Sequence, residues 1–188
     1  MVADPAAAAA RIVPELECRG VPCAVGGALC LAYWGVPRAT KDLDLNLFVG
    51  DDRLDAAFAA LEAAGVTFDR EAASARARSR GDFVAQLDDL RVDLFVAFHP
   101  YHQTVASRVA RACLPSGTEV AFLSAEDLCV FKTLFYRSKD LVDLDRLFSA
   151  RRDAFDIDYV ERWLRDLLGD DARVADIRGR YARVCGAR

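Results

Sequence analysis

The sequence predicts an α+β (α/β) fold, with a mixed sheet flanked by helices over residues 1–123 and an all-helical region over residues 124–188. In the first part, short apolar segments bounded by glycine, proline or aspartate alternate with segments of helical periodicity, a pattern typical of strands joined by helices. After Ser124 the apolar residues recur only at helical spacing. No low-complexity linker or internal repeat separates the two parts, so the helical region is expected to pack on the α/β core.

The expected elements of the first part follow from these patterns in chain order. They are helices over 5–19, 28–34, 51–63 and 101–110, and strands over 22–25, 43–49, 66–68, 83–87, 91–98, around 112 and over 120–123. Gly26-Gly27 ends the first strand, and Asp88-Asp89 supplies the turn between two antiparallel strands. Pro14 is expected to weaken the first helix or to start a new one. The arginine-rich stretch 70–80 is expected to be a solvated loop, or else a contact for RNA or a nucleotide acceptor.

The helical region is expected to begin at Ser124, whose hydroxyl caps the next helix while Asp127 reaches back to complete the cap. Two or three more helices are expected between 139 and 185. Their buried faces are marked by apolar residues at helical spacing, namely Leu141, Leu144 and Leu147, followed by Val160, Leu164 and Leu167.

Composition excludes several classes of protein. Of the 188 residues, 53% are hydrophobic and 29% are charged, which argues against a disordered chain and fits a domain with its own core. No apolar run reaches the roughly 18 residues of a transmembrane helix, and the alanines at 6–10 form too short a run for a signal peptide, so a cytoplasmic protein is expected. The net charge of −4 argues against a dedicated nucleic-acid-binding domain. The six cysteines lack C-x-x-C spacing, so neither a zinc knuckle nor a redox motif is expected.

The segment Thr40–Leu47 carries the strongest signal for chemistry. Because strand side chains alternate between faces, Asp42, Asp44 and Asn46 share one face while the intervening leucines point into a core. Aspartate is depleted in β-strands. Two aspartates on one face, about 7 Å apart along the strand, therefore require a specific explanation. The alternative is a solvated polar face on an edge strand.

A third carboxylate, Asp93, stands in the otherwise apolar strand segment 91–96. A lone carboxylate in a buried strand is costly unless it has a partner. If this strand lies beside the one that carries Asp42 and Asp44, three carboxylates meet, and two of them 4 Å apart repel by about 4 kcal/mol at an effective dielectric near 20. A divalent cation turns this repulsion into attraction, and oxygen-only ligands favour Mg2+ or Mn2+.

The Gly26-Gly27 turn stands between a strand and a helix, fifteen residues before Asp42. Exposed backbone N–H groups at such a turn suit a phosphate group. A tight turn without any binding function is the alternative, but the Asp-x-Asp strand that follows favours a phosphate site.

These motifs together resemble the signature of the DNA polymerase beta-like nucleotidyltransferase superfamily. The resemblance rests on Val25-Gly26-Gly27 and on Gly35-Val36-Pro37-Arg38-Ala39-Thr40-Lys41-Asp42-Leu43-Asp44-Leu45, and it covers about residues 20–145. In that family a Gly-Gly or Gly-Ser turn opens a helix, Asp-x-Asp follows on the next strand, and Asp93 stands where the third carboxylate falls. The form in this chain is most similar to the minimal and AbiEii-type branches, many of whose members are toxins of toxin–antitoxin pairs.

The resemblance implies a Mg2+-dependent (or Mn2+-dependent) nucleotidyltransferase that moves a nucleoside monophosphate from a nucleoside triphosphate to a hydroxyl acceptor. Asp42, Asp44 and Asp93 are then the metal-binding and catalytic residues, and the amides of Gly26 and Gly27 cradle the phosphates. The acceptor is left open between a tRNA end, a partner protein and a small molecule, and a toxin role implies a cognate antitoxin. The alternatives are an antibiotic-type nucleotidyltransferase and a non-catalytic domain that binds a nucleotide or a partner protein.

Three further residues are candidates for nucleotide binding. On a continuous helix Lys132 and Asp140 share one stripe, and AbiEii-like members similarly carry a Lys and an Asp after the third carboxylate. The resemblance implies phosphate contact for Lys132, and either an orienting ion pair or direct catalysis for Asp140. A solvated helix face is the alternative for both. Arg38, just before the Asp-x-Asp strand, either reaches a nucleotide or caps the preceding helix.

Overall fold

The computed structural model describes residues 4–186 and divides the chain into two compact units. The first consists of Met1–Leu29 and Ala39–Leu123, and the second consists of Cys30–Arg38 and Ser124–Arg188. The two residues at the extreme C-terminus and the three at the N-terminus lie outside the described part of the chain. The second unit therefore combines the helical region with a nine-residue segment that comes from the first part of the sequence.

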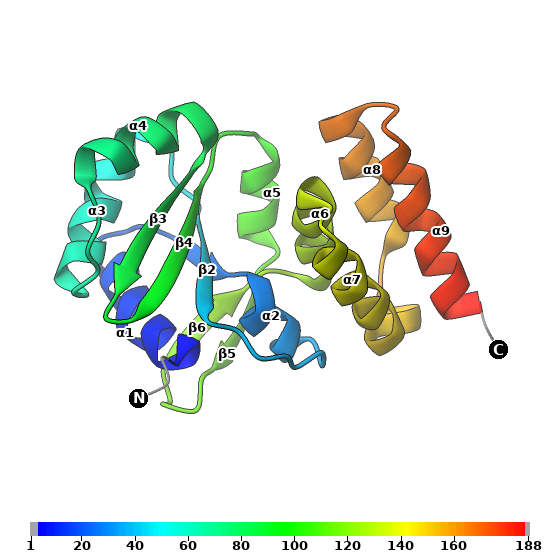
Figure 1. Ribbon diagram of the computed structural model, residues 1–188, viewed down its shortest axis with the longest axis horizontal. Coiled ribbons are helices and arrows are strands. Elements are labelled where there is room, and N and C mark those ends of the chain that lie inside the picture. The colour runs from blue at the N-terminus through cyan, green and yellow to red at the C-terminus, as the bar shows by residue number, and fades with distance from the viewer. Residues whose placement is uncertain (1–3, 187–188) are drawn as a thin grey trace. The chain divides into compact units, whose positions relative to one another are not determined.

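The first unit is built on a six-stranded mixed sheet with the strand order β3-β4-β2-β1-β6-β5 (Figure 1). β2 pairs with β4 and β1 with β6 in parallel, while the other neighbouring pairs are antiparallel. Its strands are β1 (Cys23–Val25), β2 (Asp42–Leu47), β3 (Asp82–Leu87), β4 (Leu90–Val96), β5 (Ala110–Cys113) and β6 (Glu119–Phe122). Its helices are α1 (Pro5–Cys18), the start of α2 (Gly27–Tyr33), α3 (Leu54–Ala63), α4 (Arg70–Arg80) and α5 (Tyr101–Ser107), with a 3-10 turn, η1 (Asp51–Arg53), before α3.

One face of this sheet forms the core of the first unit. Leu43, Leu45 and Leu47 of β2 are at most 1% exposed, as the alternating pattern predicts. The helix α1 contacts β1, β2 and β6 and also packs on α3, so these helices cover the apolar face. Burial of these leucines contributes roughly 1.5–3 kcal/mol each, and it fixes the register that turns the aspartates of β2 to the opposite face.

The arginine-rich stretch 70–80 is the helix α4, so the expectation of a solvated loop was wrong. Asp69 caps its first turn by accepting from the backbone N–H of Ala72, and Gly81 ends it in the left-handed conformation. Alanine and arginine are strong helix formers, and Ala73 and Ala77 are buried. A capping aspartate before the stretch and a glycine after it were the signals that identify a helix here.

The structure also differs from two smaller expectations. The first helix runs unbroken from Pro5 to Cys18 with Pro14 inside it, because burial of Ile12 and Leu16 outweighs the one lost backbone hydrogen bond. The strand expected over 66–68 is only an isolated antiparallel bridge between Thr67 and Gln86.

The second unit contains the end of α2 and the helices α6 (Ala125–Phe135), α7 (Ser138–Arg151), α8 (Ile157–Leu168) and α9 (Ala172–Gly186), with a 3-10 turn, η2 (Arg152–Ala154), after α7. Ser124 caps α6 as predicted, since its hydroxyl accepts from the backbone N–H of Asp127 at 3.0 Å. The core of the second unit is formed by the contacts of α6 with α7 and α8 and by the contacts of α9 with the same two helices. None of the helices in the described part of the chain is long and apolar enough to cross a membrane.

Candidate functional site

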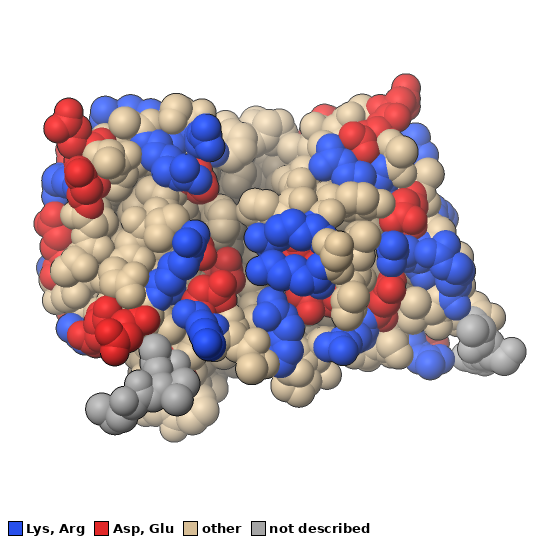
Figure 2. All heavy atoms as spheres, in the orientation of Figure 1, with Lys and Arg blue, Asp and Glu red and all other residues tan. Residues whose placement is uncertain are grey.

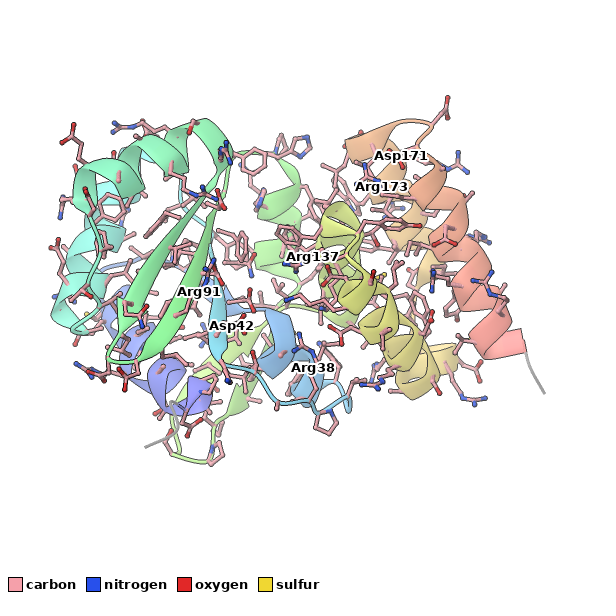
Figure 3. All side chains as sticks on the ribbon, viewed as in Figure 1. Arg38, Asp42, Arg91, Arg137, Asp171 and Arg173 are labelled. Carbon is pink, nitrogen blue, oxygen red and sulfur yellow. The ribbon has the colours of Figure 1, made fainter. Side chains whose placement is uncertain are left out.

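Three aspartates on two neighbouring strands form the candidate site of the first unit. β2 and β4 pair in parallel, with Asp44 directly opposite Asp93 and Asp42 opposite Arg91. Residues opposite each other on paired strands point to the same face of a sheet, so the three carboxylates share one face. The structure thus confirms that the two strands are neighbours, and Figure 3 shows Asp42 beside Arg91. Figure 2 shows acidic side chains at this place with basic side chains next to them.

Arg91 engages the third carboxylate. Its Nε donates to both carboxylate oxygens of Asp93 at 3.0 Å, and its Nη2 donates to Oδ1 at 2.6 Å. The Asp93 side chain is 18% exposed and that of Arg91 is 56% exposed. The hydrogen bonds to Asp93, together with the charges of Asp93, Asp42 and Asp44, raise the pKa of Arg91. One guanidinium therefore faces three carboxylates on this surface.

The donor set suits a divalent cation by its chemistry, because Mg2+ and Mn2+ prefer carboxylate oxygens. Within residues 4–186, however, no group of three aspartate, glutamate, histidine or cysteine side chains is arranged ready to hold a metal ion. Asp93 is instead paired with Arg91.

The Gly26-Gly27 turn lies directly against the aspartate face. The backbone N–H of Gly26 donates to the carbonyl oxygen of Asp44 at 2.9 Å. A Cβ atom at Gly26 would come within 2.9 Å of Nδ2 of Asn46, and a Cβ atom at Gly27, whose φ is +54°, would overlap the carboxylate of Asp44. A side chain at Gly26 would push the Asn46 amide aside, and one at Gly27 would displace the Asp44 carboxylate and would also have to adopt a positive φ. The turn and the Asp-x-Asp strand form one local structure.

A second group of charges lies in the second unit and is called here the Lys132 cluster, which consists of Arg38, Lys132, Arg137, Asp140 and Asp143. Nζ of Lys132 donates to Oδ2 of Asp143 at 2.7 Å and to Oδ1 of Asp140 at 3.3 Å. Lys132, Asp140 and Asp143 are only 5%, 0% and 2% exposed. Arg137 pairs with Asp140 at 2.7 Å and Arg38 pairs with Asp143 at 3.2 Å. A solvated helix face, one of the two alternatives for Lys132 and Asp140, is therefore excluded.

A break in the helix, not a continuous stripe, brings this cluster together. The helix α6 ends at Phe135, and Tyr136 takes the left-handed conformation with φ +52°, donating its N–H to the carbonyl of Lys132 at 2.9 Å. The next helix then starts with Arg137 as its N-cap residue, whose backbone N–H donates to Oδ2 of Asp140 at 3.2 Å. The stripe that a continuous helix would give is therefore absent, although Lys132 and Asp140 do meet.

Asp140 shows how the charges of the cluster are balanced. Burial would raise the pKa of this carboxyl, but the hydrogen bonds from Arg137 and the charge of Lys132 outweigh it and hold the pKa below its usual value. Asp140 is therefore ionised at neutral pH although it is fully buried. These contacts agree with an orienting ion pair at Asp140.

Arg91 and Arg137 belong to the two charge groups but were not selected by the motifs, whereas Asp143 shares a helical stripe with Lys132 and Asp140 by its spacing. Arg91 precedes Asp93 by two residues in a strand, and this spacing by itself places both side chains on one face. Arg137 precedes Asp140 by three residues, the spacing of an N-cap residue and the third helical position. These short spacings were the available signals.

No protein-family model matches the chain, and no curated protein matches it in sequence. Solved structures do match it along nearly its whole length. The antibiotic-resistance factor ANT(2″)-Ia in solution has a TM-score of 0.61 at 18% identity, covering 98% of this chain and 96% of that chain. The crystal structure of ANT(2″)-Ia in complex with adenylyl-2″-tobramycin has a TM-score of 0.60 at 18% identity, covering 94% and 98%. A candidate nucleotidyltransferase from Helicobacter pylori has a TM-score of 0.50 at 15% identity, covering 96% and 89%.

The chain therefore has the α/β fold of nucleotidyltransferases, as the resemblance of its motifs implies. At 18% identity the likeness is one of fold. It extends over the helical region as well as over the sheet, since nearly the full length of both chains is aligned.

Proposed function

We propose that this chain is a nucleotidyltransferase that transfers a nucleoside monophosphate from a nucleoside triphosphate to a hydroxyl group. The single observation that carries the proposal is the strand register that sets Asp44 directly beside Asp93, with Asp42 two residues away on the same face. A sheet gains no stability from three like charges at one place. Their placement against a glycine turn, in a chain with this fold, supports a phosphate-transferring site.

Asp42, Asp44 and Asp93 would hold Mg2+ or Mn2+ in this proposal. The bound ion would supply positive charge that stabilises the triphosphate and the attacking and leaving oxygens. Asp93 accepts the proton of the acceptor hydroxyl. The hydroxyl oxygen bonds to the α-phosphorus as the bond between the α-phosphorus and the bridging oxygen breaks, and pyrophosphate leaves.

In this proposal Gly26, Gly27 and Arg38 bind the nucleotide, and Lys132 and Asp140 orient other groups. The close approach of Gly26 and Gly27 to Asp44 supports a role for their amides near the phosphates. Arg38 precedes Asp42 by only four residues and carries a partly exposed guanidinium. Lys132 and Asp140 are buried and paired with each other, which supports a role in orienting other groups.

A small hydroxylated molecule is the acceptor that we favour. The support is the whole-chain match to ANT(2″)-Ia, one structure of which contains adenylyl-2″-tobramycin. A toxin role, with a tRNA or protein acceptor and a cognate antitoxin, is the other hypothesis that the sequence motif raises. The net charge of −4 favours a small acceptor over a large RNA.

The test is transfer of label from α-labelled nucleoside triphosphates in the presence of Mg2+. Aminoglycosides, other small polyols and total tRNA are offered in separate reactions, and we expect label in a small-molecule product. Label in the RNA would support the toxin hypothesis instead. Asp93→Asn is expected to lower the rate about 10²–10⁴-fold, as removal of a general base does, whereas Asp89→Asn, an exposed aspartate of the nearby turn, leaves the rate unchanged. Full activity of Asp93→Asn would falsify the assignment.

A non-catalytic nucleotide-binding domain is the second candidate function. It is favoured by one observation, the pairing of Asp93 with Arg91 in place of a metal-ready arrangement. Calorimetry of nucleotide binding with and without Mg2+ separates the two functions. Binding that is unchanged by Mg2+, together with no transfer to any acceptor, would favour this second function.

A further inference from the structure

Asn46 is a buried polar residue on the same strand face as Asp42 and Asp44. It belongs to β2, which lies between β4 and β1 in the sheet, and it stands opposite Ala24 of β1 and Phe95 of β4 (Figure 1). Only 4% of the residue is exposed. Asparagine is depleted in strands and is mostly found at the surface. Its burial in the middle of a sheet therefore requires a specific cause.

The side-chain amide of Asn46 makes no hydrogen bond to any other residue within 4–186. A polar group that is withdrawn from water without gaining a partner costs free energy, and native proteins pair nearly all such groups. The amide is nevertheless not sealed off. It does not belong to the fully enclosed side-chain groups that lack a partner, so part of the small exposed area of Asn46 is the amide itself. It is therefore shielded but still open to a ligand.

Two other polar side chains on this face are held by neighbours. The carboxylate of Asp42 accepts a hydrogen bond from the hydroxyl group of Thr40, and the carboxylate of Asp93 accepts from Arg91. Asn46 differs from both, because no group in the described part of the chain uses the hydrogen-bonding positions of its side chain. Its partner is thus to be sought outside the chain.

The Asn46 amide lies against the glycine turn. A Cβ atom added to Gly26 would stand 2.9 Å from Nδ2 of Asn46 and 3.6 Å from Cβ of Asp44, and a Cβ atom added to Gly27 would overlap the Asp44 carboxylate. The amide, the turn and this carboxylate therefore border one another, and all of them belong to the first unit. Because the turn has no side chains, a ligand can approach its backbone and the amide together.

The chemistry of this place favours an anion as the partner of the amide. Asn46 stands four residues, or roughly 13 Å, along β2 from Asp42, so the two cannot share a metal ion whose ligands lie about 2.1 Å away. A side-chain amide carries two N–H donors, which suit a phosphate oxygen. The backbone N–H of Gly26 already donates to the carbonyl oxygen of Asp44 at 2.9 Å. The Asn46 amide therefore adds a donor to what the backbone of the turn offers a phosphate group.

We propose that the side-chain amide of Asn46 donates a hydrogen bond to a phosphate group of the nucleoside triphosphate at the glycine turn. This inference rests on the proposed function and deepens it, since it adds a binding residue that the sequence motifs did not select. A hydrogen bond between a neutral donor and a charged oxygen is stronger than one between neutral groups. The bound phosphate gives the buried amide the partner that it does not find among residues 4–186.

The test is calorimetric titration of the full chain with inorganic tripolyphosphate in the presence of Mg2+. Asn46→Leu keeps the approximate size of the side chain without its donor, and Asn46→Ala removes the donor without adding bulk. We expect each to lower the affinity about tenfold, because a charge-assisted hydrogen bond is lost. Gln103→Leu, which replaces an exposed amide of α5, is the matched control and should bind as the wild type does. The proposal is overturned by wild-type affinity in both Asn46 variants, by an equal loss in the control, or by a wild type that does not bind tripolyphosphate.

Further measurements separate phosphate binding from other roles of Asn46. In urea unfolding, Asn46→Leu is expected to have a midpoint equal to or above that of the wild type, because an apolar group replaces an amide without a partner in the described chain. Lower midpoints in both variants, with unchanged affinity, would indicate a structural residue and overturn the proposal. Electron paramagnetic resonance should show unchanged Mn2+ affinity in Asn46→Ala without polyphosphate, and a loss there would identify the amide oxygen as a metal ligand instead. ATP should show the same loss as tripolyphosphate, whereas a loss with ATP alone would assign the amide to the nucleoside.

Transfer assays keep this inference apart from the proposed function. If the wild type transfers no nucleotide but both Asn46 variants lose affinity for tripolyphosphate, the proposed function fails and the phosphate contact stands. If the wild type transfers nucleotide and both variants bind tripolyphosphate as the wild type does, the phosphate contact fails and the proposed function stands.

Discussion

The two charge groups of this protein are opposite in composition and in burial. On β2 and β4, three half-buried aspartates face one exposed arginine, Arg91. In the Lys132 cluster, two fully buried aspartates are surrounded by three cations. The first group carries surplus negative charge near solvent and the second carries surplus positive charge at its surface. The two groups therefore differ in the sign of the charge that predominates and in how far their carboxylates are withdrawn from solvent.

Lys132→Met is expected to have the largest effect, a loss in the free energy of unfolding that has no counterpart at the aspartate site. The substitution keeps the volume of the side chain but leaves two buried carboxylates without their central cation. Breaking a buried pair in this way costs about 3–5 kcal/mol. Urea unfolding measures this loss, and Lys139→Met, at an exposed position of α7, should stay within about 0.5 kcal/mol of the wild type. An equally small loss for Lys132→Met would show that the cluster contributes little to the fold.

The next largest effect is expected at the glycine turn, from Gly27→Ala. The new Cβ must displace the carboxylate of Asp44 and must also adopt a positive φ, which costs roughly 1–2 kcal/mol by itself. Gly117→Ala provides a matched control, because Gly117 also has a positive φ, of +85°, but has nothing within 4 Å of an added Cβ. We expect Gly27→Ala to lose more stability than the control in thermal unfolding and also to lose Mn2+ binding. Equal losses would mean that the contact with Asp44 has no consequence.

Acid is expected to weaken the second unit through Asp140. The folded-state pKa of this carboxyl lies below its usual value, so the folded protein binds fewer protons than the unfolded chain at a pH near 4. Its contribution is therefore complete above the unfolded pKa and is lost as the pH falls through the lower, folded pKa. Urea midpoints between pH 6 and pH 3 should fall less steeply for Asp140→Asn than for the wild type. If the urea midpoints of both proteins fall equally steeply, the lowered pKa of Asp140 does not contribute to the stability of the fold.

The smallest effect is expected from Arg91→Ala. An exposed ion pair of this kind contributes about 0.2–1 kcal/mol, so release of Asp93 should raise the affinity for Mn2+ by no more than about fivefold. Electron paramagnetic resonance of free Mn2+ measures this affinity, and Arg11→Ala, which removes an exposed arginine paired with Asp88, is the control. A lower affinity in Arg91→Ala would show that Arg91 does not compete with the ion.

The strands and helices that carry the aspartate site were predictable because their signals are local. The alternation of aspartate and leucine in 42–47 gives both the strand and its two faces. Gly26-Gly27 gives the turn, and Ser124 gives the start of a helix. The helix over 70–80 was missed although its capping residues, Asp69 and Gly81, stand in the sequence.

Three members of the Lys132 cluster, Arg38, Lys132 and Asp140, were candidates from the sequence, but the geometry of the cluster was not predicted. Helical spacing places Lys132 and Asp140 on one stripe, but the chain breaks at Tyr136, whose left-handed conformation no local signal announces. Contacts across that break, and the pairing of Arg38 with Asp143 over 105 residues of sequence, depend on how helices pack. Local sequence patterns do not predict these side-chain contacts, because the contacts join segments that are brought together only by folding.

The sequence by itself determined which side of each strand carries charge, because side chains alternate along a strand whatever lies beside it. It also determined where the chain turns, because glycine permits backbone conformations that other residues avoid. Only the tertiary structure decided that Asp44 stands beside Asp93, that Arg91 holds that carboxylate, and that Lys132 is directed inward. These facts depend on strand order and helix packing, which are set by the burial of apolar surface across the whole chain.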